Sequence, residues 1–201
     1  MMYRDQLVQT GELSDTGELL SRNVPDSYRR GVELSLAVNA TKWFSLGGNA
    51  TLSQNHIKNY VDYIYYADYS DVVAFERGRT TIAYSPSVIA GTFFDFHTHG
   101  FAARLSTRYV SKQYLTNGQY EDLTLPRYCV SDLDISYTLR TKRIEKVRFG
   151  VKIGNLFNAK YCASGYGGSW LEGDTLADRG SWACYFPQAT ISALGNVTIH
   201  F

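Results

Sequence analysis

The sequence has few prolines and methionines, few cysteines and no long run of apolar residues. Of its 201 residues, 4 are Pro, 2 are Met and 3 are Cys. No stretch approaches the roughly 18 to 20 consecutive apolar residues that a membrane-spanning helix requires, which argues against a helical membrane protein. Three cysteines cannot all pair with one another, so the cysteines do not form a complete disulfide framework.

The sequence also lacks a dominant charge and a catalytic constellation. Its 20 basic and 19 acidic residues give a net charge of +1 without a long block of one sign, so no nucleic-acid partner is indicated. We find no Ser-His-Asp, Cys-His or paired-carboxylate arrangement and no glycine-rich phosphate loop. His97 and His99 form a His-x-His pair, but in a predicted turn and without a nearby third ligand. We therefore predict no catalytic residues, no metal site and no cofactor.

Tyrosine and phenylalanine are abundant, with 16 and 10 residues, and this balance favours β-strands. The mean hydropathy of -0.25 is low. It is nevertheless compatible with a membrane-spanning β-barrel, whose strands need only about 9 to 11 residues and alternate polar with apolar side chains.

Alternation with a period of two residues recurs along the chain. Val32, Leu34, Leu36 and Val38 fall on one face of an extended segment whose other face is polar. Together with the N-terminal segment 3–8, the repeats of this pattern predict eight antiparallel strands. The alternating segments are 28–40, 44–53, 84–96, 101–112, 132–139, 147–153 and 189–201.

The connections between these segments alternate strictly between short and long. Because successive antiparallel strands end at opposite rims, all the long connections lie on one rim and all the short turns on the other. This asymmetry is typical of outer-membrane barrels, so we predict an all-β fold: part of an antiparallel transmembrane β-barrel with long extracellular loops and short periplasmic turns. The short connections are 40–43, 97–100 and 141–146, and the long, polar ones are 10–27, 58–83, 113–127 and 162–188.

Three alternatives also fit alternating strands. A soluble β-sandwich or lipocalin-like barrel would have to enclose several long cationic side chains in a small interior. A complete eight-stranded or porin-like outer-membrane protein would need a signal peptide, whereas the N-terminus shows none and the chain instead begins like a fragment or an excised piece, inside a strand. An enzymatic barrel would need a catalytic cluster at one rim.

Several motifs resemble the TonB-dependent receptors of the outer membrane. Residues Asn155-Leu156-Phe157-Asn158 with Tyr161, then Tyr185-Phe186-Pro187 and a final alternating strand ending in Phe201, match that family's C-terminal signature in order and spacing. The segments 3–8 and 28–33 look like its mid-barrel strands. The resemblance covers nearly the whole chain.

The resemblance implies that residues 1–201 are the last eight strands of a 22-stranded barrel, without the plug domain and its TonB box. It also implies a transport role: TonB-dependent uptake of a ferric siderophore or a similar scarce nutrient such as cobalamin, in the bacterial outer membrane. The implied partners are outer-membrane lipid, the TonB system acting through the plug, the barrel-assembly machinery and the nutrient ligand. In the family, a C-terminal aromatic such as Phe201 is read as an assembly signal.

Two groups of residues are candidate ligand contacts. Arg104 and Arg108, with Lys112, Arg148 and Lys152, are predicted to face the lumen, where they could attract an anionic ligand, contact the plug or be solvated. In the long loops, aromatic side chains offer large contact area at low entropy cost, although they could equally be girdle or packing residues. The loop candidates are Tyr63, Tyr66, Tyr166 and Trp170.

A disulfide is a further hypothesis. If Val147 pairs with Ile199 and Val151 with Gly195 in the last two strands, the same register places Cys162 opposite Cys184. A bond there would staple the last long loop and leave Cys129 as a lone thiol.

Overall fold

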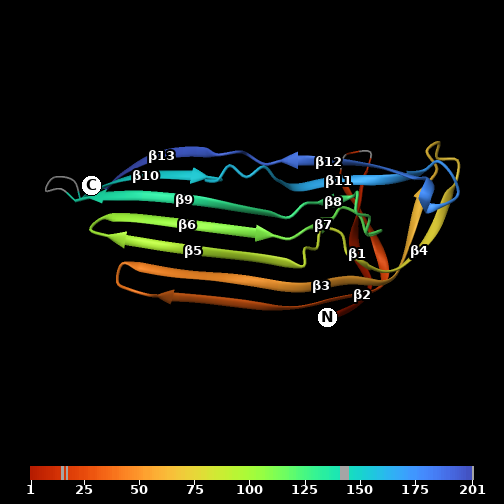
Figure 1. Cartoon of the computed structure of the whole chain (residues 1–201), viewed down its shortest axis with the longest axis horizontal. Helices are drawn as coiled ribbons and strands as arrows, with labels where there is room; N and C mark the ends of the chain where they lie inside the picture. Colours follow the sequence, from red (N-terminus) through yellow and green to blue (C-terminus); the bar gives the residue numbers. More distant parts are fainter. Residues whose placement is uncertain (15, 17, 141–144, 201) are drawn as a thin grey trace.

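The computed structural model describes residues 1–14, 16, 18–140 and 145–200. Its main sheet follows chain order, with eight antiparallel strands along one continuous path, as the alternation predicts (Figure 1). These strands are β1 (Met2–Leu13), β2 (Leu19–Asn39), β3 (Phe44–Tyr65), β5 (Val88–Thr98), β6 (Phe101–Val110), β9 (Tyr128–Leu139), β10 (Lys146–Gly154) and β13 (Ser192–His200).

One face of the sheet, which we call the outer face, is apolar and exposed. Its side chains continue from strand to strand because the register places Leu46 opposite Phe94 and Phe94 opposite Leu105. Leu34 and Leu36 are 62% and 71% exposed. An apolar surface of this extent is not stable against water, so it needs lipid or another apolar partner.

The height of the apolar face matches a membrane. On β3 the apolar positions run from Phe44 to Leu52, which at about 3.4 Å per residue is roughly 27 Å. The lipid-facing band of outer-membrane barrels is about 25 Å tall. Aromatic side chains lie at the rim with the short turns. Trp43 packs edge-on against Phe96 at 5.4 Å between ring centroids, and Phe96 packs against Phe101 at 6.0 Å. Such a ring of aromatics is typical of the membrane interface.

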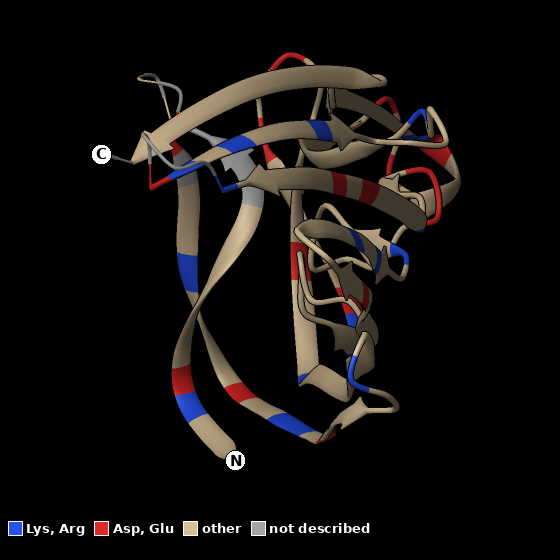
Figure 2. Ribbon diagram, turned by 90° about the vertical axis from the view of Figure 1, so that its left-hand side faces the viewer, with Lys and Arg blue, Asp and Glu red and all other residues tan. Residues whose placement is uncertain are grey.

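The opposite, inner face is polar. It carries Ser35, Asn49, Asp95 and Arg104, each one residue away from an apolar side chain of the outer face. Viewed from the end with the short turns, the sheet is a curved, open wall (Figure 2). Within the described residues β13 pairs only with β10, and residues 31–39 of β2 pair only with β3.

The predicted rim asymmetry is confirmed where the structure describes it. The turns after β2 and β5 lie at one end of the sheet, and the long connections extend from the other (Figure 1). Residues 141–144 of the third short turn lie outside the described residues. Phe201, the predicted assembly signal, also lies outside them.

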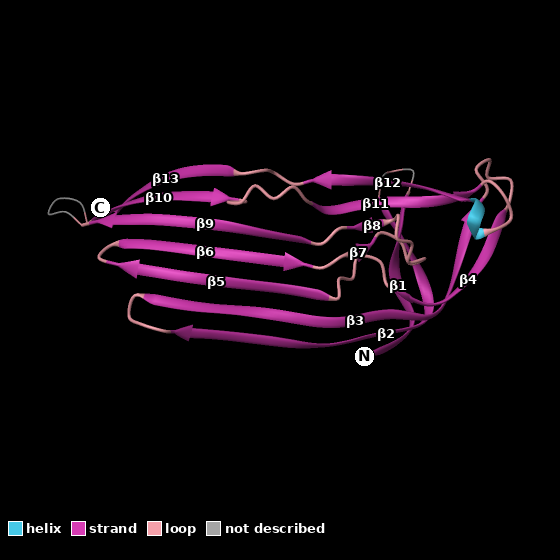
Figure 3. Ribbon diagram, in the orientation of Figure 1, coloured by secondary structure: helices cyan, strands magenta, loops and turns pink. Residues whose placement is uncertain are grey.

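The long connections contain further strands that the alternation does not predict. β3 continues far beyond the apolar band and pairs with β4 (Val72–Thr81), so residues 58–83 are largely strand. Residues 162–188 form a second hairpin of β11 (Cys162–Leu171) and β12 (Arg179–Pro187), with a short 3-10 helix, η1 (Leu176–Asp178), at its tip (Figure 3). β7 (Gln113–Tyr114) and β8 (Thr124–Leu125) form a third, small pair.

The hairpin formed by β1 and β2 folds over the part of the sheet that extends beyond the apolar band. Among the described residues, β1 pairs only with residues 19–28 of β2, beyond the apolar band, and the hairpin turns across the other strands (Figure 1). Val8 and Val24 of this hairpin are buried against Ile57, Tyr60 and Ile82.

A second buried cluster joins the remaining outer hairpins. It contains Ile64 of β3, Leu171 of β11, and Leu115, Leu123 and Leu125 from the β7–β8 segment, all at most 3% exposed. The outer segments therefore have an apolar core of their own, separate from the membrane band.

Candidate functional site

A row of alternating charges crosses the inner face. Asp95, Arg104, Asp134 and Lys152 lie opposite one another on the adjacent strands β5, β6, β9 and β10. Arg104 Nε lies 3.5 Å from Asp95 Oδ1, and Arg148 donates a hydrogen bond of 3.0 Å to Ser136 Oγ. The inner-face cations are therefore accompanied by carboxylates, and this wall is not a simple anion-attracting surface.

The inner face is hollowed along this row. One hollow of about 550 Å³ is lined by Asp95, Arg104, Asp134, Arg148 and Lys152, among others. Arg104 and Arg108 together line a neighbouring hollow of about 510 Å³. The structure thus brings the predicted pair Arg104 and Arg108 to one surface, whereas Lys112 lies outside it and forms an ion pair of 2.7 Å with Glu121.

The Asn155 turn ends β10 and links β9 to the segments that precede β11 and β13. Asn155 has a positive φ of 51°, and its backbone N–H donates to Asp132 Oδ1 of β9 at 2.8 Å. Its side-chain amide donates to the carbonyl oxygens of Ala159 at 2.8 Å and Ala189 at 3.1 Å. A short polar side chain that tolerates left-handed backbone suits this position, which explains the Asn of the motif structurally.

Three outer hairpins meet at a group that we call the Tyr120 junction, formed by Asp62, Arg77, Tyr120, Asp122 and Arg179. The Tyr120 ring lies 3.9 Å from the guanidinium carbon of Arg179 and 4.6 Å from that of Arg77. Its hydroxyl donates to Asp62 Oδ2 at 2.8 Å, and Arg179 Nη2 pairs with Asp122 Oδ1 at 2.6 Å. Burial and the Asp62 charge raise the pKa of Tyr120, which keeps the phenol neutral.

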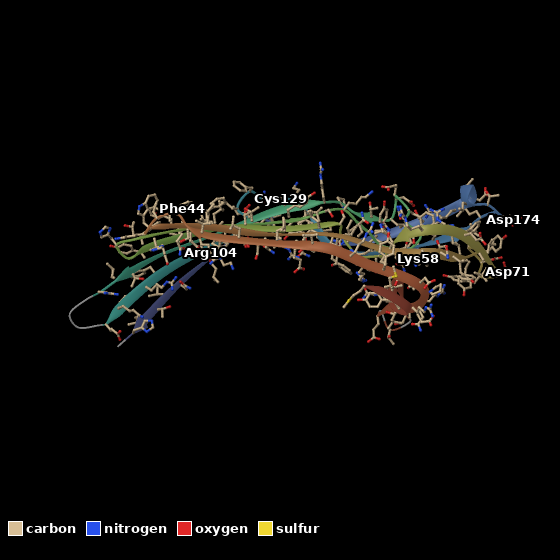
Figure 4. The ribbon with its side chains drawn as sticks, turned by 90° about the horizontal axis from the view of Figure 1, so that it is seen from below. Phe44, Lys58, Asp71, Arg104, Cys129 and Asp174 are labelled. Atoms are coloured by element: carbon tan, nitrogen blue, oxygen red, sulfur yellow. The ribbon has the colours of Figure 1, made fainter. Side chains whose placement is uncertain are left out.

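Farther from the apolar band than the junction, the tips of the β3–β4 and β11–β12 hairpins meet. Tyr66 and Leu171 form a parallel bridge, and Ala67 N–H donates to Leu171 O at 3.0 Å. The Tyr66 hydroxyl donates to the Asp174 carboxylate, and this hydrogen bond raises the pKa of Tyr66. Asp71 and Asp174 lie at the end of the molecule farthest from Phe44 (Figure 4).

The two tips enclose a hollow of about 570 Å³, which we call the tip pocket. Its wall is aromatic, with Tyr65 47%, Tyr69 81% and Trp182 42% exposed. The lining residues are Leu20, Tyr65, Tyr66, Ala67, Tyr69, Gly168, Ser169, Trp170 and Trp182.

The loop candidates from the sequence divide between two places. Tyr66 and Trp170 both line the tip pocket. Tyr63 lines an adjoining hollow that shares Gly168 and Ser169 with the tip pocket, and the Arg22 guanidinium carbon lies 5.4 Å from its ring centroid. Tyr166 packs against Trp182 at 5.5 Å and does not line the tip pocket.

Other residues of these surfaces were not among the sequence candidates. Tyr120 and Arg179 of the junction and Asp174 of the tips are separated in sequence and meet only through the hairpins. A usable signal for the tips was their composition: segments 65–72 and 170–178 contain acidic residues but no Lys, Arg or His.

The predicted disulfide is wrong. The register between β10 and β13 is as expected, with Val147 opposite Ile199. Beyond the Asn155 turn it shifts, so Cys184 lies opposite Tyr166 and Cys162 opposite Pro187. All three cysteines are free. The two connecting segments, 155–161 and 188–191, differ in length, and this difference moves β11 relative to β12.

The described residues contain no group of three or more His, Cys, Asp or Glu side chains arranged to hold a metal ion. His99 Nδ1 instead lies 2.8 Å from Thr98 Oγ1 in the turn. Nor do these residues include a helix with the length and apolar character for spanning a membrane.

An antiparallel wall with an apolar outer face, a charged inner face and hairpins rising from one rim defines a segment of an outer-membrane β-barrel. A profile of the TonB dependent receptor-like β-barrel family matches residues 2–156, so the chain belongs to this family. Its members are transport receptors of the outer membrane and not enzymes, which confirms the class and location that the sequence predicts.

Solved structures show the same fold. The ferric-catecholate import receptor Fiu from E. coli K12 is 20% identical with a TM-score of 0.59, over 100% of this chain and 24% of that receptor. The ferric yersiniabactin uptake receptor FyuA from Yersinia pestis is 18% identical with a TM-score of 0.61, over 98% and 25%. The copper transporter OprC is 17% identical with a TM-score of 0.57, over 98% and 27%.

The chain therefore spans about a quarter of these receptors. At such identities the similarity concerns the fold alone. No curated protein matches the chain.

Proposed function

We propose that the chain forms the C-terminal part, the last eight strands, of a 22-stranded receptor barrel that takes up a ferric siderophore or a similar scarce nutrient by TonB-dependent transport. The observation that carries the proposal is the family match over residues 2–156, on a wall with an apolar outer face and a charged inner face. Coupling to TonB requires a plug domain, which residues 1–201 do not include according to the family resemblance.

The partners follow from the two faces. The outer face, with Leu34 and Leu36 exposed, is the surface for outer-membrane lipid. The inner-face row around Arg104 is the surface for the plug, the ligand path or both. Phe201 is the proposed recognition signal for the barrel-assembly machinery.

We also propose where the ligand is contacted. Arg104 and Arg108 line the inner hollow through which a ligand would pass, and Tyr66 and Trp170 line the tip pocket where it would first bind. Tyr63 and Tyr166 are expected to contribute less, because neither lines the tip pocket and the second packs against Trp182.

The structural neighbours do not decide the cargo, since their names refer to ferric catecholate, ferric yersiniabactin and copper. A porin-like passive channel or a small eight-stranded barrel is the alternative. Such a small barrel would pack its interior tightly, whereas the inner face here is hollowed and highly charged.

The test is uptake by cells that express or lack the receptor, each with and without TonB. We would measure accumulation of radioactive iron from a panel of ferric siderophores, and of labelled cobalamin. The proposal predicts that one of these substrates accumulates only when both receptor and TonB are present. Uptake that persists without TonB and rises linearly with substrate concentration would instead support the passive channel.

A further inference from the structure

We propose that the tip pocket binds an organic cation, an ammonium or quaternary ammonium group carried on an apolar body. This names the chemical class of the molecule first captured, and it rests on the proposed function only in requiring the chain to be assembled in a receptor barrel. Three properties of the pocket support the inference: its aromatic faces, their fixed orientation and the charge around them.

The aromatic faces are open to solvent. Tyr65 and Tyr69 lie 6.3 Å apart between ring centroids, tilted by 42°, and both are exposed. Trp182 and Trp170 complete the wall from the neighbouring hairpin. Faces of Tyr and Trp attract cations through the ring quadrupole, and several faces around one hollow form a cage for an alkylammonium group.

Glycines hold the two indoles against the hairpin. Gly168 lies opposite Trp182, and Gly180 opposite Trp170. A Cβ at Gly168 would lie 3.1 Å from Trp182 Nε1, and one at Gly180 would lie 2.2 Å from Trp170 Cε2. Each indole therefore lies across a strand at a site without a side chain. The wall is formed before the ligand arrives, which lowers the entropic cost of binding.

The charge around the pocket is negative. The tip segments 65–72 and 170–178 carry Asp68, Asp71, Glu172, Asp174 and Asp178, and no basic residue. Hydrogen bonds from Ser70 lower the pKa of Asp68, so it stays ionised at neutral pH. An anionic complex would be repelled by such a tip, whereas a cation would be attracted.

Two described cations, Arg179 and Arg22, lie close to the lining of the pocket, and the first is paired with a carboxylate. Arg179 pairs with Asp122 in the junction, and only 11% of its side chain is exposed. Arg22 lies over the ring of Tyr63 and lines an adjoining hollow that shares Gly168 and Ser169 with the tip pocket, so one positive charge lies against the five carboxylates of the tips. The aromatic hollow and the acidic surroundings are thus independent features that select the same class of ligand.

The test uses the purified, detergent-solubilised receptor, without TonB. Choline is titrated and followed by ligand-observed NMR, beside its neutral isostere 3,3-dimethylbutan-1-ol and a methyl glucoside. We expect choline to bind about ten-fold more tightly than the isostere, because the two differ in charge and hardly in shape. Equal affinities, or displacement of choline by the glucoside at similar concentration, would overturn the proposal.

Variants locate the site. Trp182→Ala and Tyr65→Ala should each weaken choline binding about ten-fold, whereas Trp182→Phe should retain most of it. Trp43→Ala, at the opposite rim, is the matched control and should have no effect. Choline binding unchanged in both alanine variants would place any cation site elsewhere and refute the proposal.

The two proposals fail separately. Because binding is measured on isolated receptor, loss of TonB-dependent uptake in cells leaves this result intact. Conversely, uptake of an anionic siderophore with no affinity for choline would refute the cation site and leave the transport proposal standing.

Discussion

At the scale of single residues, Tyr120 joins the outer hairpins to one another. It is 8% exposed, lies between two guanidinium groups and donates to Asp62. One ring thus links β3, β4, the β7–β8 segment and β12. The composition of a loop does not predict this role of Tyr120, because its partners come from segments far apart in sequence.

We predict that Tyr120→Ala loosens all three hairpins together. Loss of a buried aromatic side chain typically costs about 3 to 5 kcal/mol, whereas Tyr120→Phe keeps the ring contacts and loses one hydrogen bond, worth about 1 kcal/mol. Hydrogen exchange of residues 115–123 and 164–171 in the assembled receptor would measure this. Tyr69→Ala, at an 81% exposed ring, is the control and should leave exchange unchanged. Faster exchange confined to residues 115–123 would show that the hairpins are not coupled through Tyr120.

At the scale of elements, alternation predicts those strands that have one apolar face. It finds β10 and β13 with their register, since Val151 pairs with Gly195 as expected. It misses β4, β11 and β12, because outside the membrane both faces of a strand can be polar or aromatic and the backbone hydrogen bonds alone hold the pair. The sequence shows the aromatic residues of these segments, but it does not show that they line one pocket.

The disulfide prediction is wrong for a related reason, because alternation fixes the register only within a continuous pair of strands. A register can be extended along a strand only while both chains keep two-residue steps, and the Asn155 turn interrupts this on one side. Asn155 belongs to a sequence motif, yet its effect on the register depends on a positive φ and on hydrogen bonds to Ala159 and Ala189. These are properties of the folded chain.

The observed register predicts a different crosslink. Because Tyr166 lies opposite Cys184, Tyr166→Cys should form a disulfide with the native Cys184 on mild oxidation. Directly opposed antiparallel residues have Cα atoms about 4.5 to 5.5 Å apart, within the range that a disulfide spans. Mass spectrometry of peptides before and after reduction would detect it, in a Cys162→Ser background. The unmodified chain is the comparison, and a Cys162–Cys184 bond there would contradict the observed register.

At the scale of the whole molecule, the two faces of one sheet meet different solvents. Neighbouring residues along a strand are alternately exposed to lipid and to the charged interior, so the same substitution should be costly at one position and tolerated at the next. On β2, Leu34 faces outward beside Ala50, and Ser35 faces inward beside Asn49.

We therefore predict that Leu34→Arg impairs assembly and that Ser35→Arg does not. An arginine facing lipid near the middle of the membrane costs about 2 to 4 kcal/mol, whereas one facing a wet interior costs little. The receptor would be extracted from outer membranes, and the folded fraction measured by the mobility difference between unheated and heated samples in gel electrophoresis. Both variants add the same side chain to the same strand, which controls for expression and for strand propensity. If Ser35→Arg were the more damaging, the outer face would be the one turned inward, and the lipid contact, the lumen row and the orientation of both hairpins would have to be reversed.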